Sequence, residues 1–323
     1  MLDPVHIVML IIFTAFTVLG TVVNGFIVAV NGIDWVKTRN LNSIDIILIS
    51  LGAVRFCFQL EIFLEEILSE LSSDFTLKTR SETFSTISVF LELSGFWFAC
   101  WLSVFYCAKI ANFRHPLFIF MKSKIPGMLT WLLLSSILAS LVTCIPTAWG
   151  LFKYYHSNST TDIPLTNCII NCTIARDEYQ NKTTTEIGRM LYNKVHLIPI
   201  LSLGYSLPFF IFCVAVVLLI GSLWSHTRKM NGNMMGFRNP NPEAHFIAIK
   251  VMASFLLFYM FYFTFAILDI AYLFSNKDLW RYVILLGSTA YPSLHSVILI
   301  LSNSKLKQSL ARILHLQIHE SGI

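Results

Sequence analysis

Seven long apolar runs, separated by shorter polar segments, make up most of this chain. Each run is close to or longer than the ~20 residues that an α-helix needs to cross the hydrocarbon core of a bilayer. The runs cover residues 5–32, 44–68, 84–108, 126–149, 196–224, 246–273 and 282–303. This pattern predicts an all-α fold, a bundle of seven transmembrane helices that forms a single domain over residues 1–323.

The composition agrees with a membrane protein. Of the 323 residues, 55% are hydrophobic and only 13% are charged, so polar groups are too few to cover a soluble globule of this size. The first run has no basic flank before it and no small-residue cleavage site after a short apolar core. We therefore expect a retained span instead of a signal peptide, in a multi-pass protein of the plasma membrane.

The distribution of charge predicts the orientation of the bundle. Four segments, at residues 33–43, 109–125, 225–245 and 304–323, are rich in Lys and Arg and poor in acids. Their cations are Lys37, Arg39, Lys109, Arg114, Lys122, Lys124, Arg228, Lys229, Arg238, Lys305, Lys307 and Arg312, and their acids are Asp34, Glu243 and Glu320. Because cytoplasmic loops are enriched in Lys and Arg, these segments should be cytoplasmic and the N-terminus should lie outside.

The connection at residues 150–195 is then the second extracellular loop. It carries sequons for N-glycosylation at Asn158, Asn171 and Asn181, which can be modified only on the luminal or outer side. Cys168 and Cys172 lie in the same oxidising compartment, and the sequence leaves open whether they form a disulfide.

The cytoplasmic tail, residues 304–323, is predicted to contain a short amphipathic helix. From Lys305 to His319, basic residues alternate with Leu306, Leu310 and other apolar residues at helical spacing. A helix of this kind fits the inner leaflet of the membrane.

Polar residues within the apolar runs predict an internal polar core. Arg55 lies midway along the second run, with Asn24 at similar depth in the first run and His295 and Ser296 in the seventh. A charged group at membrane depth requires a partner or a water-lined cavity. The core could be purely structural, or it could switch between two hydrogen-bonding arrangements, and the two roles are compatible.

Glu92 predicts a binding cavity. It lies too deep in the third run to be a surface residue, so we expect its charge to face a cavity that opens to the exterior. Aromatic residues crowd the third and sixth runs, and those that point inward would supply apolar walls and stack on a cation. Nothing in the sequence predicts a metal site, a cofactor or an enzyme, because the nine His residues lack ligand spacing.

Motifs along nearly the whole chain resemble one family of receptors. At residues 105–116, the end of the third run reads Phe-Tyr-Cys-Ala-Lys-Ile-Ala-Asn-Phe-Arg-His-Pro. Further motifs are Asn24–Asn31, Leu48–Phe56 around Arg55, His226–Met230, Tyr291-Pro-Ser and Asn303–Lys307. The chain is similar in these motifs to the bitter taste receptors (taste receptor type 2).

This resemblance implies a G protein-coupled receptor that detects bitter small molecules and activates a G protein of the gustducin type. The acids of the outer half, Glu92 above all, indicate that cations are among these ligands. By position against the family's motifs, the implied ligand-binding residues are Glu65, Glu66, Ser88, Val89, Glu92, Tyr262 and Leu285. The implied G protein-facing residues are Tyr106, Lys109, His115, Lys122 and His226. Members often carry Trp or Asn where Ser88 and Glu92 stand, so ligand preference does not transfer.

Three rival classes make different predictions. A vomeronasal-type chemoreceptor would share the fold but is not expected to match the third and seventh runs so closely. A seven-helix transporter would distribute charge along a continuous path and break helices at the midplane. An intramembrane hydrolase would need a metal or a carboxylate pair, and the candidate pair Asp45 and Asp269 should lie near opposite faces of the membrane.

Overall fold

The computed structural model describes residues 4–71, 76–111, 116–159, 204–222, 242–271 and 278–314. Every regular element in these ranges is an α-helix. The helices are α1 (Pro4–Thr38), α2 (Ser43–Leu71), α3 (Thr76–Ile110), α4 (Pro116–Ser159), the Gly204–Ser222 helix, α6 (Pro242–Ala271), α7 (Asp278–Ser302) and α8 (Ser304–Ile313). The predicted all-α, seven-helix membrane bundle is confirmed.

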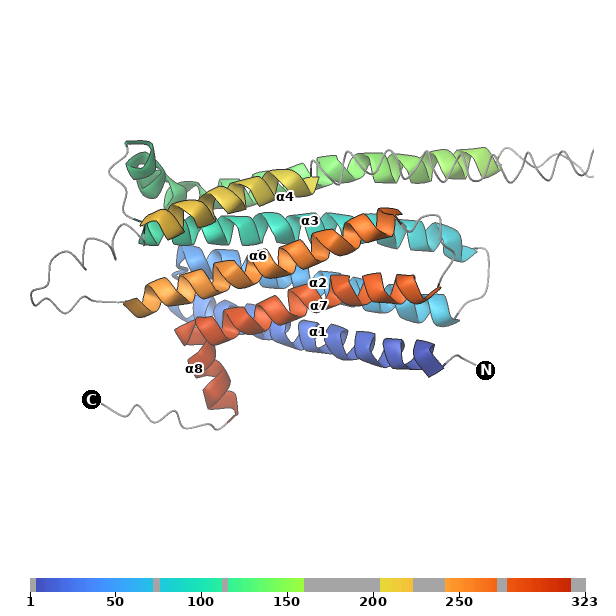
Figure 1. Cartoon of the computed structure of the whole chain (residues 1–323), viewed down its shortest axis with the longest axis horizontal. Helices are drawn as coiled ribbons and strands as arrows, with labels where there is room; N and C mark the ends of the chain where they lie inside the picture. Colours follow the sequence, from blue (N-terminus) through green and yellow to red (C-terminus); the bar gives the residue numbers. More distant parts are fainter. Residues whose placement is uncertain are drawn as a thin grey trace, which may run out of the picture.

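The long helices run side by side, and α8 turns away at the end of the bundle opposite to the start of α1 (Figure 1). α1 packs on α2 and α7, α3 packs on α2 and α4, and α6 packs on α7. Within the described ranges, six helices are long and apolar enough to cross a membrane, and α6 adds a shorter apolar run, Ile249–Tyr262.

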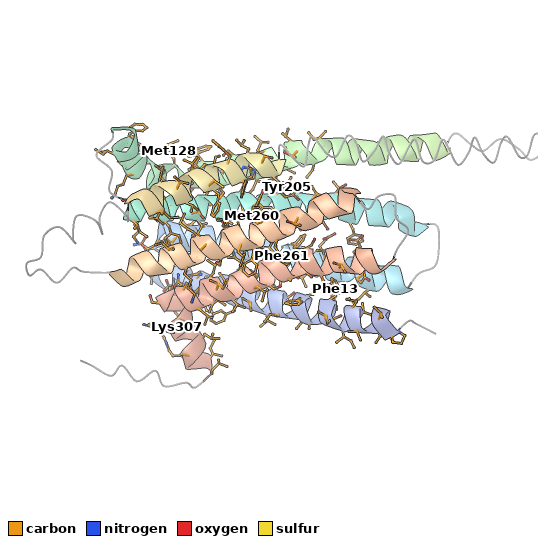
Figure 2. The ribbon with its side chains drawn as sticks, in the orientation of Figure 1. Phe13, Met128, Tyr205, Met260, Phe261 and Lys307 are labelled. Carbon is orange, nitrogen blue, oxygen red and sulfur yellow. The ribbon has the colours of Figure 1, made fainter. Side chains whose placement is uncertain are left out.

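Hydrophobic side chains cover the outer surface of the bundle. Phe261 on α6 and Trp131 on α4 are 61% and 73% exposed, and Phe261 and Met260 point away from the neighbouring helices (Figure 2). In water such a surface would be unstable, whereas lipid solvates it. Spanning segments must satisfy their own backbone polar groups, which explains why they are helical.

Hydroxyl side chains in the spans hydrogen-bond to their own helix. The Oγ1 atoms of Thr14, Thr17 and Thr21 each donate to the carbonyl four residues earlier, at 2.8–2.9 Å. These bonds let polar residues sit in an apolar helix without a partner elsewhere.

The helix ends differ in part from the predicted segments. α3 continues to Ile110, and Pro116 is the first residue of α4, a position where its missing N–H costs nothing. α4 continues to Ser159, into the range predicted as the second extracellular loop. The remainder of that loop, with Asn171, Asn181 and both loop cysteines, lies outside the described residues.

Candidate functional site

Glu92 on α3 is the acid at the centre of the candidate site. Tyr205, on the Gly204–Ser222 helix, donates its hydroxyl to Oε2 of Glu92 at 2.7 Å. The hydroxyl of Tyr262 on α6 lies 3.3 Å from the hydroxyl of Tyr205. Both tyrosines are buried. Side chains from three helices therefore meet at one carboxylate.

An aromatic cluster lies directly beside Glu92. Phe96, one helical turn further along α3, packs against rings from three other helices. Its ring is stacked on Tyr291 at 5.3 Å between centroids and meets Tyr205 and Tyr259 edge-to-face at 5.2 and 4.7 Å. Tyr259 also donates its hydroxyl to the backbone carbonyl of Tyr205 at 2.6 Å. These geometries are the favourable ones for aromatic pairs, so the cluster packs α3, α6, α7 and the Gly204–Ser222 helix together.

A second polar group connects α2 and α3. Ser88 on α3 donates its hydroxyl to Oε2 of Glu61, which is buried in α2. Glu61 is close enough to Glu65 and Glu92 to interact with both electrostatically. The predicted residue Glu66 is also buried in α2, and Glu65 is half-buried.

Hydrogen bonds join Arg55, Ser296 and Asn24, three of the residues that we grouped in a polar core. Arg55, 3% exposed, donates from Nη1 to Ser296 at 3.0 Å and from Nη2 to the hydroxyl of Tyr291 at 2.9 Å. Ser296 in turn donates to Oδ1 of Asn24 at 2.7 Å. These bonds connect α2, α7 and α1. The guanidinium also lies 5.2 Å from the centre of the Tyr291 ring, within cation–π range.

His295, which we grouped with this core, lies in it but does not join its hydrogen bonds. It is buried, and its ring is stacked on Tyr291 at 6.3 Å and tilted against Phe255 at 5.4 Å. Among the described residues, neither ring nitrogen has a hydrogen-bond partner.

A further set of bonds, which sequence reasoning missed, extends the core. Gln59 on α2 donates from Nε2 to the carbonyl of Thr289 and to Ser293, both at 3.1 Å. Ser293 donates to the carbonyl of Phe16 on α1 at 2.9 Å. Gly20 permits this close approach, since a Cβ there would stand 2.3 Å from Ser293 Oγ and 2.7 Å from Gln59.

A small void separates the acid from the polar core. It is lined by Arg55, Phe58, Leu91, Glu92, Gly95, Tyr291 and Pro292. Its space corresponds to about one water molecule. The buried cation of Arg55 and the half-buried acid Glu92 thus border the same narrow volume. Pro292 lies inside α7 at this level and removes one backbone donor, which is a common cause of helix bending.

Two of the implied pocket residues are apolar. Leu285 on α7 packs against a separate cluster formed by Phe13, Phe58 and Ile62 between α1 and α2. Val89 packs against the main core. Neither has a polar group, so their part in a site would be packing alone.

The predicted cytoplasmic face is described only in part. Tyr106 is half-buried against the core at the end of α3, whereas Lys109 and Lys122 are accessible. His115 and His226 lie outside the described residues, and the side chain of Asn158, near the end of α4, does too.

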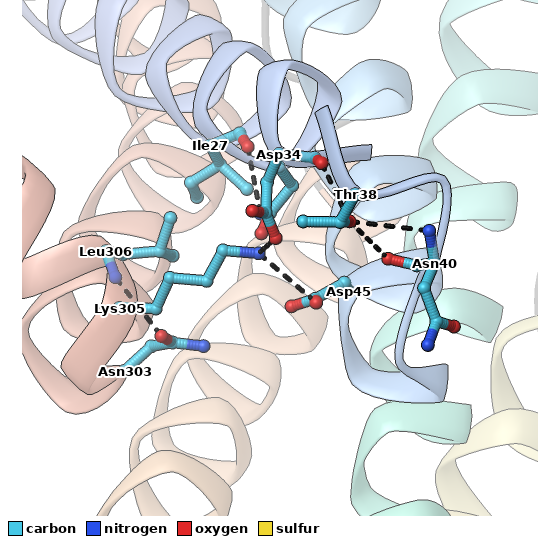
Figure 3. Close-up of polar contacts among 9 residues, drawn as sticks. Ile27, Asp34, Thr38, Asn40, Asp45, Asn303, Lys305 and Leu306 are labelled. Atoms are coloured by element: carbon cyan, nitrogen blue, oxygen red, sulfur yellow. Dashed lines mark hydrogen bonds and ion pairs between the residues drawn. The ribbon is translucent and has the colours of Figure 1, made fainter. Parts of the chain in front are cut away.

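α8 is joined to α1 and α2 by a pair of ionic contacts. Lys305 Nζ lies 2.6 Å from Asp34 Oδ2 and 3.2 Å from Asp45 Oδ2 (Figure 3). Asn303 caps α8 by accepting from the backbone N–H of Leu306 at 3.2 Å. Partial burial lowers the pKa of Lys305, but its bonds to the two carboxylates outweigh that effect and leave the pKa above its ordinary value.

Tyr205, Gln59 and Tyr291 are the functional residues that sequence reasoning missed. One signal could have found the tyrosines, because a Tyr inside an apolar span needs a partner for its hydroxyl. Gln59 follows Arg55 by one helical turn, which places it on the same face of α2. The partner helix in each case depends on three-dimensional packing.

Long apolar helices around a half-buried acid, an aromatic cluster and a polar core define a multi-pass membrane protein with a candidate internal site. The model of the taste receptor protein (TAS2R) family matches residues 1–317. The chain belongs to the taste receptor type 2 family, and is thus a bitter taste receptor of the G protein-coupled class and not an enzyme.

Its relatives cover nearly the same length. Taste receptor type 2 member 40 of Gallus gallus is 34% identical over 93% of this chain and 91% of its own length. Member 41 of Pan troglodytes is 32% identical over 94% of both chains. Member 119 of Mus musculus is 35% identical over 90% of this chain and 79% of its own length.

Proposed function

We propose that this receptor detects bitter small molecules that carry a positive charge, and that it binds them in the outer half of the bundle with Glu92 as the charge partner. The bound state would activate a G protein of the gustducin type at the cytoplasmic ends of the helices. The observation that carries the proposal is the half-buried Glu92 carboxylate at the edge of the aromatic cluster around Phe96.

The electrostatics favour a cationic ligand. Tyr205 is a neutral donor to Glu92, and among the described residues no Lys or Arg forms an ion pair with this acid. A carboxylate in a low-dielectric interior attracts a cation far more strongly than one in water. The neighbouring aromatic faces add cation–π attraction.

The depth of Glu92 is suitable for a ligand from outside. The apolar span of α3 begins at Thr86, so Glu92 lies roughly 9 Å along the helix from that end at 1.5 Å per residue. The Thr86 end points to the same side as the start of α1, which the charge distribution assigns to the exterior.

Activation would be a shift between two arrangements of the helices. An agonist shifts the equilibrium only by the difference between its affinities for the active and resting arrangements. Phe96 links the agonist side to α6 and α7, and Tyr291 links it to Arg55. Tyr106 and the exposed Lys109 and Lys122 are the described residues proposed to face the G protein.

Glu92→Gln tests the charge pairing, because it keeps the size and the acceptor for Tyr205 but removes the charge. We expect responses to cationic agonists to fall at least about tenfold relative to neutral ones, since one charge-assisted contact corresponds to about 1.4 kcal/mol or more. Calcium release is measured in cells that express the receptor with gustducin or with an unrelated Gα subunit.

Surface staining of an epitope-tagged receptor controls for folding. An unchanged ratio between cationic and neutral agonists would remove Glu92 from the site. Equal responses with both Gα subunits would contradict the gustducin assignment. They would not affect the proposal that Glu92 binds the ligand.

A further inference from the structure

Glu61 is a buried acid that the proposed pairing with Glu92 does not use. It is 7% exposed, and one carboxylate oxygen, Oε2, accepts from Ser88. The other oxygen, Oε1, is fully buried and has no hydrogen-bond partner among the described residues. A buried acceptor left unpaired costs about 1–3 kcal/mol, and more when it is charged, so it requires an explanation.

The position of Glu61 brings it into the candidate site. Glu61 and Glu65 are one turn apart on α2, and Ser88 and Glu92 are one turn apart on α3, so each pair shares a helix face. The bond from Ser88 to Glu61 joins the two faces. We call these four residues the acidic seam. Glu61 is close enough to interact electrostatically with both other acids of the seam.

The basic residue of α2 does not neutralise the seam. Arg55 is the single Lys or Arg in the sequence of α2, and its two terminal nitrogens donate to Ser296 and Tyr291 on α7. Oε1 of Glu61 therefore presents an unfilled acceptor beside the other acids of the seam. A ligand that fits it must bring a cation that also has an N–H to donate.

We propose that Glu61 is a specificity-determining residue that selects agonists whose cation carries N–H groups, such as protonated amines and amidinium groups, over quaternary ammonium compounds. A quaternary ammonium group supplies charge without a donor, so it leaves Oε1 of Glu61 unpaired. The inference rests on the proposed function, because Glu92 provides the general preference for cations and Glu61 adds the preference for a donor.

The test uses matched triplets of compounds on one scaffold. Each triplet contains a tertiary amine that is protonated at neutral pH, its N-methyl quaternary derivative and a neutral carbon isostere. Quinuclidine derivatives provide such a series. Wild-type receptor should respond to the protonated amine at a concentration at least about tenfold lower than to the quaternary compound.

Glu61→Gln should abolish most of this preference, because the neutral amide oxygen is a weaker acceptor. Glu92→Gln should instead weaken the responses to both cations relative to the neutral isostere. Ser94→Ala is the matched control on the same helix, since the Ser94 hydroxyl donates to the backbone carbonyl of Phe90, and this variant should retain the preference for the protonated amine.

The outcomes separate the two proposals. If Glu61→Gln keeps the wild-type preference while Glu92→Gln loses cation responses, the role of Glu61 is wrong and the proposed function stands. If no responding triplet shows a wild-type preference, the role of Glu61 is equally wrong. If Glu92→Gln has no effect on cations, the proposed function fails. If Glu61→Gln does not reach the cell surface, Glu61→Asp provides the same comparison, because its shorter side chain moves the acceptor away from the ligand. A reduced preference of Glu61→Asp for the protonated amine supports the inference. An unchanged preference overturns it.

Discussion

Single polar side chains determine which helices meet in this protein. In an apolar interior each buried donor or acceptor needs a partner, and few other polar groups compete for it. Glu92 is bound by Tyr205, and Arg55 is bound by Ser296 and Tyr291. The pairing of one residue thus fixes the rotation of a whole helix against its neighbour.

Tyr205→Phe should destabilise the receptor without ligand by about 1–3 kcal/mol, because Glu92 loses the hydrogen bond from the Tyr205 hydroxyl. A cationic agonist would compensate, so it should raise the thermal midpoint of the variant more than that of the wild type. The measurement is thermal unfolding of the detergent-solubilised receptor. Tyr259→Phe is the control, since its hydroxyl bonds to a backbone carbonyl and not to Glu92. If agonist raises the thermal midpoint of Tyr205→Phe by the same amount as that of the wild type, the role of Tyr205 is contradicted.

The sequence predicted the important polar residues better than it predicted their partners. Glu92 and Arg55 were recognisable because charge inside an apolar run is costly wherever the helix packs. Tyr205 and Gln59 were not, because their roles depend on which face of another helix lies opposite. The packing of Leu285 against the cluster of Phe13, Phe58 and Ile62 likewise depends on which helices lie side by side.

The helices themselves were largely predictable, because length and hydrophobicity suffice to identify a span. The residues at which the helices begin and end were harder to predict. α3 begins at Thr76 and α4 continues to Ser159, both beyond the apolar runs. Outside the hydrocarbon core, a helix can continue through polar residues with no change in hydrophobicity to mark its end. The short α8 was predicted from its alternation of basic and apolar residues, but not the contacts that attach it.

Lys305→Gln should loosen α8 from α1 and α2. Because Lys305 is about one third exposed, we expect a loss of up to about 1 kcal/mol in the free energy of unfolding. The pKa of Lys305 is raised in the folded state, so its contribution is fully present below the ordinary value of 10.5 and is lost as the pH rises through the folded value.

Thermal unfolding of the wild type and the variant over a range of pH checks this expectation. The difference in midpoint should be constant near neutrality and vanish in strong alkali. Lys307→Gln is the control, because Lys307 is exposed on the same helix. An equal effect of the two substitutions would show that the ionic contacts with Asp34 and Asp45 contribute nothing specific.

In the complete bundle, the void beside Gly95 connects the agonist side to the polar core. Glu92 borders it on one side and Arg55 on the other. A water molecule there would transmit a change in the charge around Glu92 to the hydrogen bonds of Arg55. The path from Glu92 on α3 to Arg55 on α2 crosses this void alone, and both helices also carry candidate ligand-binding residues.

Gly95→Ala should fill this void and leave both charged groups in place. A Cβ at this position would meet only Val54 Cγ1, at 3.9 Å, so it fits without a clash. We expect helix α3 to become more stable by about 0.5–1 kcal/mol, while the maximal response to agonist falls and agonist affinity is retained. Dose–response curves for calcium release, with radioligand or thermal-shift affinities, measure both quantities. Gly127→Ala, which faces open space on α4, is the control. A full maximal response from Gly95→Ala would contradict this route.

Two groups of helices differ in the contacts that hold them: one group is joined by hydrogen bonds and ion pairs, and the other by aromatic side chains. α1, α2, α7 and α8 are held by directional bonds through Arg55, Gln59 and Lys305, which break abruptly when the geometry changes. α6 and the Gly204–Ser222 helix meet mainly through aromatic rings, stacked for Phe209 with Tyr259 and edge-to-face for Phe212 with Phe255, and the burial of apolar surface is less directional than a hydrogen bond. We therefore expect the first group to act as the stationary frame and the aromatic interface to be the plane along which the other helices move.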